Sequence, residues 1–142
     1  MKLSKESCLI EVTSRNHDER GEIVSIVDNE IKNVSIITSN AGSIRSNHYH
    51  YVDYHYMYVV KGEIDYFYKG LDDEEVKYLK VCEGQSIYTP PNEIHACYFS
   101  VDTVLIVSSK NQRDQATYES DTVRIELLTQ QNIKNMMSKY AK

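Results

Sequence analysis

Three of the five histidines in the chain, His48, His50 and His55, lie within eight positions of one another. In a β-strand the side chains at i and i+2 point to the same face, so the rings of His48 and His50 can converge on one point. His55 follows after a four-residue gap that can bend the chain into the next strand, and His95 begins another strand-like run forty residues later. Four neutral imidazoles gathered inside a β-barrel would bind a divalent transition metal such as Zn, Fe, Ni or Cu, and would suit Ca or Mg poorly.

The same histidines allow two other interpretations. A histidine in a strand is often only a hydrogen-bonded or exposed side chain, so the His-x-His pair alone is weak evidence for a metal. Histidine is also the side chain most often used as a general base, because its ordinary pKa lies near neutral pH. The residues leave open whether His48 and His50 bind a metal or act as acid and base.

The elements that must position these histidines are predicted to be β-strands. Short runs rich in Val, Ile, Tyr and Phe recur along the chain, and several of them alternate between apolar and polar residues. The runs cover residues 22–27, 33–38, 55–60, 63–68, 76–81, 95–100 and 103–109. Stretches that contain Gly, Asn, Asp or Pro separate them, and turn signals every 8–12 residues or so are typical of a sandwich or a barrel.

The sequence predicts a single all-β domain over residues 1–142, because a chain of 142 residues suits one domain and no linker or repeat interrupts it. A short C-terminal helix is expected at about 130–142. There Ile133, Met136, Met137 and Tyr140 recur at helical spacing.

The composition argues against several classes of partner and location. The net charge of −5, the pI near 5.5 and the absence of a Lys/Arg-rich block argue against nucleic acid. No run approaches the ~18 apolar residues of a membrane span, and the start of the chain shows no signal peptide. Cys8, Cys82 and Cys97 are odd in number and widely spaced, so we expect a reduced, cytoplasmic location rather than a disulfide framework.

Two segments resemble the paired motifs of the cupin superfamily. In residues 42–62, Gly42 is followed by five residues, His-x-His, four residues, His55, six residues and Gly62. This spacing matches the first motif throughout, with His55 at the position of its usual glutamate. Residues 84–99, "GQSIYTPPNEIHACYF", resemble the second motif, with Asn92 in place of its glycine and Phe99 in place of its final asparagine.

The cupin resemblance implies a fold and a ligand set. The fold would be a double-stranded β-helix, also called a jelly-roll barrel, which agrees with the many short strands. The metal ligands, carried over position by position, would be His48, His50, His55 and His95.

Three further stretches, "DERGEIVSI", "GSIRSNHYH" and "FSVDTVLIVSSKNQRDQATYESDTVRI", resemble cupins of sugar-nucleotide pathways. These are relatives of the deoxysugar 3,4-ketoisomerases and of the dTDP-4-keto-6-deoxyhexose 3,5-epimerases. The ketoisomerases carry two catalytic histidines in an Arg-Gly-x-His-x-His segment, which implies catalytic roles here for Arg45, His48 and His50, with Ser46 in place of the glycine. Those ketoisomerases work without a metal and generally have no ligands equivalent to His55 and His95.

This resemblance implies an isomerase or epimerase that acts on a nucleotide-linked keto-deoxy sugar for bacterial surface polysaccharide. A histidine would remove the acidic proton next to the keto group, and a cation, a hydrogen-bond donor or a metal would stabilise the enolate oxygen. Two alternatives stay open. One is an iron-dependent cupin dioxygenase, and the other is a non-catalytic cupin that binds a small ligand or a metal.

The tyrosines of residues 49–68 suggest a partner. Alternation predicts that Tyr54, Tyr56 and Tyr58 face away from the barrel interior, and that Tyr49 and Tyr51 lie on the face opposite to His48 and His50. Because a large exposed aromatic patch usually marks a partner surface, we expect a homodimer.

The stretch after the last predicted strand is expected to lie at the surface. Arg113 and Asp114 would be surface or latch residues, and Glu119, Asp121 and Arg124 would pair locally.

Overall fold

The computed structural model describes residues 4–10 and 12–141 of the chain. Within these residues it contains twelve strands and two short helices. In chain order they are β1 (Cys8–Ile10), β2 (Thr13–Asp18), β3 (Gly21–Ser25), β4 (Asn33–Ser39), β5 (Ile44–His50), β6 (His55–Lys61), β7 (Glu63–Gly70), β8 (Lys77–Cys82), β9 (Ser86–Thr89), β10 (Glu93–Tyr98), β11 (Thr103–Ser109), α1 (Gln115–Ser120), β12 (Thr122–Arg124) and α2 (Ile133–Tyr140). Each of the seven predicted runs overlaps one of these strands.

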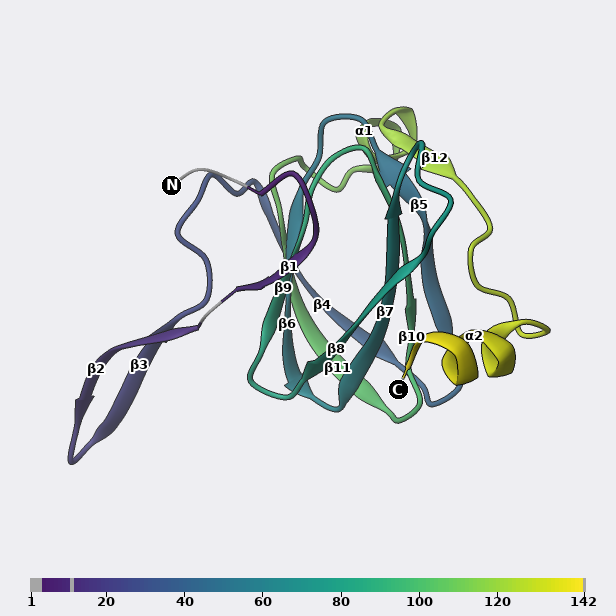
Figure 1. The fold of residues 1–142 in the computed structure, drawn as a ribbon. Coiled ribbons are helices and arrows are strands. Elements are labelled where there is room, and N and C mark those ends of the chain that lie inside the picture. The colour runs from purple at the N-terminus through teal and green to yellow at the C-terminus, as the bar shows by residue number, and fades with distance from the viewer. Residues whose placement is uncertain (1–3, 11, 142) are drawn as a thin grey trace.

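Two five-stranded antiparallel sheets face each other and form a barrel (Figure 1). The strand order is β1-β9-β6-β11-β4 in the first sheet and β12-β5-β10-β7-β8 in the second. Apolar side chains from both sheets fill the space between them. On β6 the alternation predicted from the sequence is confirmed, since His55, Met57 and Val59 are all buried on the inner face. The expected all-β jelly-roll barrel is confirmed.

The strand register brings histidines from both sheets together. His48 on β5 and His95 on β10 are directly paired in the second sheet. His55, the first residue of β6, belongs to the first sheet and pairs with Thr89 of β9 and Ser109 of β11. Because both sheets direct these histidines into the barrel, three residues distant in sequence meet inside it.

A β-bulge immediately precedes His48. Ser46 and Asn47 have positive φ angles of 73° and 55°, and the register with β10 shifts at this point. The Asn47 side chain ties the bulge to the C-terminal segment: its Oδ1 accepts from the backbone N–H groups of Leu127 and Leu128, and its Nδ2 donates to the Leu128 carbonyl. Bulges redirect a side chain next to a functional site, and this one sets the direction of His48.

The predicted aromatic patch is wrong for Tyr54 and Tyr56, which are only 6% and 3% exposed. They face away from the barrel interior but pack with Tyr88 into a second apolar cluster. This cluster is covered by the N-terminal part of the same chain, through Cys8, Ile10, Val27 and Ile31. Tyr51, in contrast, is 53% exposed. Outward alternation does not predict exposure here because a distant segment folds back over the sheet.

The C-terminal segment covers the outside of the second sheet. Helix α2 lies inside the predicted helical tail, whose last residue, 142, is outside the described residues. Its Ile133 packs with Phe67 of β7 and Ala96 of β10. Neither helix in the described part of the chain has the length and hydrophobicity that a bilayer crossing requires.

Candidate functional site

Three buried histidines form a compact group inside the barrel. His48, His55 and His95 each offer one ring nitrogen, and these three atoms all lie within 4.8 Å of one another. The ring centroid of His95 is 4.8 Å from that of His48 and 5.2 Å from that of His55. Two of the rings come from one sheet and one from the other, so the packing of the two sheets fixes the group.

The electrostatics of this group favour neutral rings. Burial lowers the pKa of His48 to about 2 and that of His95 to about 4. Burial also places the pKa of His55 well below its ordinary value, and the neighbouring histidines lower it further. A neutral imidazole has a free lone pair on one nitrogen, which is the form that binds a metal.

The hydrogen bonds of the group fit a transition metal. His95 Nδ1 donates to the Glu93 carbonyl at 3.1 Å, which leaves its Nε2 as the nitrogen with the lone pair. Among the described residues, His95 Nε2 and His55 Nδ1 are buried without any hydrogen-bond partner. Buried polar atoms without a partner are uncommon in native proteins and often mark an ion or a water. The donor set, all nitrogen, suits Zn, Fe, Ni or Cu.

His50 lies beside this group but is bonded differently. Its ring centroid is 4.6 Å from that of His48, yet His50 is outside the set of three whose ligand atoms converge. His50 Nδ1 lies 3.2 Å from the Asp121 carbonyl and 3.2 Å from Thr122 Oγ1. The carbonyl can only accept, and the Thr122 hydroxyl donates its own proton to the Tyr118 carbonyl. Nδ1 therefore carries the proton of His50, and Nε2 is the free base.

The predicted set of four ligands thus divides into two kinds of histidine. His48, His55 and His95 have ligand atoms that converge, whereas His50 lies outside this group. Its Nδ1 is bonded to a backbone carbonyl, as that of His95 is, and its free Nε2 can accept a proton from a substrate. The candidate metal site is accordingly built on three histidines.

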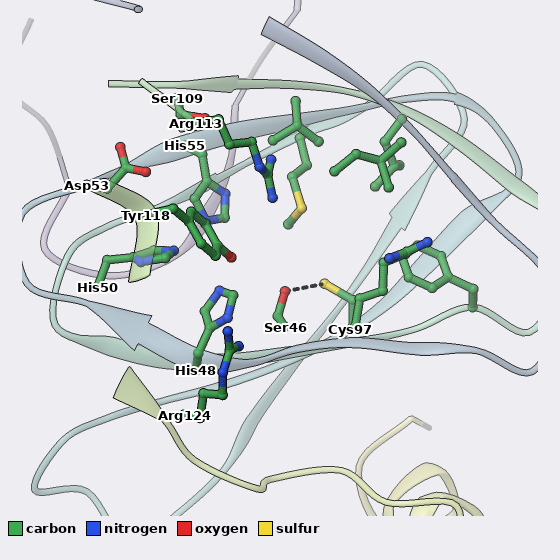
Figure 2. Close-up of a pocket in the computed structure, with 16 residues that line it drawn as sticks. Ser46, His48, His50, Asp53, His55, Cys97, Ser109, Arg113, Tyr118 and Arg124 are labelled. Carbon is green, nitrogen blue, oxygen red and sulfur yellow. Dashed lines mark hydrogen bonds between the residues drawn. The ribbon is translucent and has the colours of Figure 1, made fainter. Parts of the chain in front are cut away.

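A cavity of about 170 Å³ opens next to the histidines (Figure 2). His48, His50 and His55 line one part of it, and Met57, Phe99, Leu105 and Val107 line another. His95 is fully buried and does not line the cavity. The cavity therefore has a polar, histidine-lined part and an apolar part, as a site for a small organic ligand requires.

Side chains from the segment after β11 complete the cavity. Tyr118 of α1 places its ring 5.4 Å from that of His50, and the Arg113 guanidinium lies 5.1 Å from the centre of the Tyr118 ring. Arg124 of β12 also lines the cavity and pairs with Glu119 at 2.7 Å. Burial raises the pKa of Tyr118, whereas Arg113 and Arg124 oppose that shift. The two guanidinium groups bring positive charge to the cavity wall.

Sequence reasoning missed these contributions. Arg113 was expected at the surface or as a latch, and Tyr118 was not singled out. Arg124 was expected in a local pair, which its bond to Glu119 confirms, but its place in the cavity wall was not predicted. The pairing of β12 with β5, in which Arg124 lies opposite His48, carries the segment to the site. A three-residue strand gives no local signal for such long-range pairing.

Arg45 lines the same cavity as the histidines. Its guanidinium is engaged with β4 of the other sheet, since Nε donates to Ser39 Oγ at 2.7 Å and Nη2 donates to the Thr38 carbonyl at 2.9 Å. The arginine thus links the two sheets as well as contributing to the cavity. Cys97 is nearby, and burial raises the pKa of its thiol to about 12, so it is not poised as a nucleophile.

Solved structures share this fold. QdtA, a 3,4-ketoisomerase from Thermoanaerobacterium thermosaccharolyticum solved with TDP, is 21% identical with a TM-score of 0.69, over 99% of this chain and 100% of that chain. WlaRB, the TDP-quinovose 3,4-ketoisomerase from Campylobacter jejuni, is 19% identical with a TM-score of 0.70, over 85% of this chain and 94% of that chain. These similarities confirm the cupin fold that the paired motifs predicted.

A third structure is part of a larger protein. The capsular polysaccharide assembling protein CapF from Staphylococcus aureus is 21% identical with a TM-score of 0.61, over 82% of this chain but only 35% of that chain. A search of curated proteins finds no match to the chain.

The comparison with family models is more direct, because it rests on the sequence. The model described as the polysaccharide biosynthesis C-terminal domain matches residues 16–123, which include β5, β6, β10 and all four site histidines. With this match over more than half of its length, the chain belongs to the polysaccharide biosynthesis C-terminal domain family and has the cupin fold of the sugar 3,4-ketoisomerases.

Proposed function

We propose that the chain is an isomerase or epimerase of a nucleotide-linked keto-deoxy sugar, with His50 as the base that removes the proton next to the keto group. One observation carries the proposal: His50 faces the cavity with its proton held on Nδ1 by two acceptors, which leaves Nε2 free to accept another. A base for this reaction must be within hydrogen-bond reach of a carbon acid and unprotonated at neutral pH. The bonds at Nδ1 fix Nε2 as the nitrogen of His50 that would accept the proton.

Proton abstraction leaves negative charge on the keto oxygen, and this charge needs stabilisation. A divalent transition metal held by His48, His55 and His95 would supply it as a Lewis acid. For isomerisation, His50 then returns the proton to the former keto carbon, and a proton passes between the two oxygens. Epimerisation requires a second donor that delivers a proton to the opposite face of the same carbon. Both outcomes begin with the same abstraction.

The charge of the cavity supports an anionic substrate. Arg113 and Arg124 bring two guanidinium groups to its wall, and Arg124 is largely exposed. Guanidinium groups match the oxygens of a diphosphate in charge and geometry. Solved QdtA structures contain TDP and TDP-4-keto-6-deoxyglucose, and we extend that substrate class to this chain. The family description supports a role in polysaccharide synthesis.

Iron-dependent dioxygenase chemistry is the second candidate function. The observation in its favour is the set of three buried histidines with convergent nitrogens, which resembles the all-histidine site of some cupin dioxygenases. In that case the apolar part of the cavity would hold a thiol or a diketone, and O2 would be consumed.

The test is deuterium exchange in D2O with a nucleotide-linked 4-keto-6-deoxyhexose, with oxygen uptake recorded in parallel. We expect deuterium at a carbon next to the keto group, with no oxygen consumed. His50→Asn should lower the exchange rate by about 100-fold or more, because a positioned base contributes 10²–10⁴ in rate. His55→Glu, which restores the usual cupin ligand, should retain part of the exchange.

Three outcomes would contradict the proposal. Oxygen uptake with a thiol or a diketone, together with no exchange on keto sugars, would favour the dioxygenase. Neither exchange nor oxygen uptake would favour a non-catalytic binding protein. Full exchange in His50→Asn would assign the base to another residue.

A further inference from the structure

One carboxylate organises the turn that joins the two histidine-bearing strands. Residues 51–54 lie between β5, which ends at His50, and β6, which begins at His55. Asp121, just after α1, reaches this turn from outside the barrel. Its Oδ1 accepts from the backbone N–H groups of Tyr51 at 3.1 Å and Val52 at 3.0 Å, and its Oδ2 accepts from that of Asp53 at 2.9 Å.

The backbone of the same residue contacts the proposed base. The Asp121 carbonyl accepts from His50 Nδ1 at 3.2 Å, and the next residue, Thr122, offers the second acceptor at 3.2 Å. Asp121 therefore holds the turn with its side chain and the imidazole with its main chain. The two sets of bonds fix residues 121–122 against His50 and the three residues that follow it.

Of the three donors to the carboxylate, only the Asp53 N–H belongs to a buried residue. Tyr51 and Val52 are each 53% exposed, so water can bond their N–H groups if the carboxylate is removed. Water cannot, however, hold the turn at a fixed distance from residues 121–122 as the carboxylate does. The bonds are charge-assisted, and three backbone donors converge on one side chain, which makes the link short and directional.

We infer that Asp121 is a positioning residue that holds His50 in the tautomer and orientation required of the base. The inference rests on the function proposed above for His50. Without the carboxylate, the pairing of β12 with β5 and the bond from the Tyr51 N–H to the Asp121 carbonyl still hold residues 121–122 near His50. The turn after His50 loses its three carboxylate bonds, however, so the acceptors shift against Nδ1 and the ring samples both tautomers. Chemistry then slows, while binding of the nucleotide part of the substrate changes little, because the pairing of β12 with β5 keeps Arg124 in the cavity wall.

Asn111 and Asp53 also take part in the hydrogen bonds at this turn. Asn111 donates from Nδ2 to Asp121 Oδ2 at 3.5 Å and from its backbone N–H to Asp53 Oδ1 at 3.0 Å. Asp53 is buried, and it is held at both ends: its carboxylate accepts from Asn111, and its backbone N–H donates to Asp121. Replacement of Asp121 thus leaves the Asp53 side chain its own partner and removes only the bond to its backbone.

The first measurement is the tautomer of His50, observed by long-range ¹H–¹⁵N correlation NMR on the full chain labelled with ¹⁵N-histidine and kept free of metal. The wild-type spectrum should show a proton on Nδ1 and none on Nε2. Asp121→Ala should give averaged nitrogen signals for His50. Asp121→Asn, which keeps one acceptor oxygen, should lie between the two.

Asp114→Ala is the matched control. Asp114 caps α1 by accepting from the Thr117 N–H at 3.0 Å, so its loss weakens the same segment without touching the turn or His50. The His50 signals of this variant should match those of the wild type. Identical His50 signals in Asp121→Ala and the wild type would overturn the inference, as would averaged signals in both alanine variants. If Asp121→Ala does not fold, Asp121→Asn decides in the same way.

The second measurement is the deuterium exchange rate with the nucleotide-linked 4-keto-6-deoxyhexose. Asp121→Ala should lower kcat by about 10–100-fold, as loss of an orienting outer partner does, with KM changed less than about threefold. Equal loss in Asp114→Ala, or a rise in KM alone, would contradict a positioning role. If the wild type shows no exchange, the proposed function fails, whereas the NMR result still decides whether Asp121 orients His50.

Discussion

Ser46 and Asn92 both occupy positions where the resembling motifs carry glycine, and both have left-handed backbone conformations. Their φ angles are 73° and 58°. Asparagine tolerates this region better than most residues, because its short side chain can bond locally, whereas serine is less suited to it. The chain thus keeps the backbone that glycine would favour while it replaces the glycine itself. Sequence comparison identified both departures, but only the structure shows that the conformation is retained.

Ser46→Gly should stabilise the protein. Relief of the left-handed strain favours the folded state by roughly 1–2 kcal/mol, and the extra freedom of glycine in the unfolded chain offsets part of this. We expect a net gain of about 0.5–1 kcal/mol in the free energy of unfolding, measured by urea denaturation. Ser43→Gly, in the preceding turn, is a control without positive φ and should not stabilise. A loss of stability in Ser46→Gly would show that the serine side chain outweighs the strain.

At the scale of the elements, much of the barrel could be predicted and the segment that closes the site could not. The strands from β4 to β11 are rich in Val, Ile and Tyr and are separated by turn residues, so local pattern reveals most of them. The exceptions are β5, whose residues 44–50 lie in none of the predicted apolar runs, and β9, whose four residues, Ser86–Thr89, are all buried and show no alternation in burial. Helix α1 has no buried residue and depends on the Asp114 cap. Its place beside the histidines depends on the pairing of β12 with β5, which no local pattern encodes.

The histidines illustrate the same division. Motif spacing brought His48, His50, His55 and His95 together correctly as a candidate site. It could not separate the three with convergent nitrogens from His50, because the distinction depends on where the ring nitrogens lie in the folded barrel. The acceptors that hold His50 Nδ1, at Asp121 and Thr122, come from a segment seventy residues away in the sequence.

The Asn47 side chain should anchor the C-terminal segment on β5. Asn47→Gly removes three hydrogen bonds while it keeps the left-handed backbone accessible, so we expect a loss of about 1–3 kcal/mol. Amide hydrogen exchange should also accelerate in residues 127–140. The control is Gln130→Ala, which removes one exposed bond to the Gly42 carbonyl and should change stability by less than about 0.5 kcal/mol. Unchanged protection of residues 127–140 in Asn47→Gly would contradict this role.

At the scale of the whole molecule, the β2–β3 hairpin extends away from the barrel (Figure 1). Strand β4 forms a free edge of the first sheet, and its Val34 and Ile36 are 62% and 74% exposed. An unpaired edge with exposed apolar side chains invites strand addition from another chain. The homodimer expected from the sequence therefore stays a prediction, but its surface moves from the tyrosines of residues 49–68 to the edge strand β4.

Ile36→Lys should shift the protein toward the monomer, because a charge on the edge strand opposes pairing. Light scattering at micromolar concentration should report a dimer for the wild type and a monomer for this variant. Val101→Lys adds the same charge to the exposed turn between β10 and β11 and should remain dimeric. A monomeric wild type, or equal dissociation of both variants, would reject β4 as the interface.

The proposed mechanism has His48, His55 and His95 bind a metal while His50 is the base. The metal content of single variants distinguishes these two roles. Each protein is loaded with Zn²⁺, desalted and analysed by mass spectrometry of the metal. We expect about one equivalent per chain in the wild type and in His50→Asn, and less than about 0.2 equivalents in His95→Asn, because each ligand of a three-histidine site is a direct bond to the metal. Equal loss of metal in His50→Asn and His95→Asn would make His50 a ligand rather than the base, and an empty wild type would remove the metal from the account.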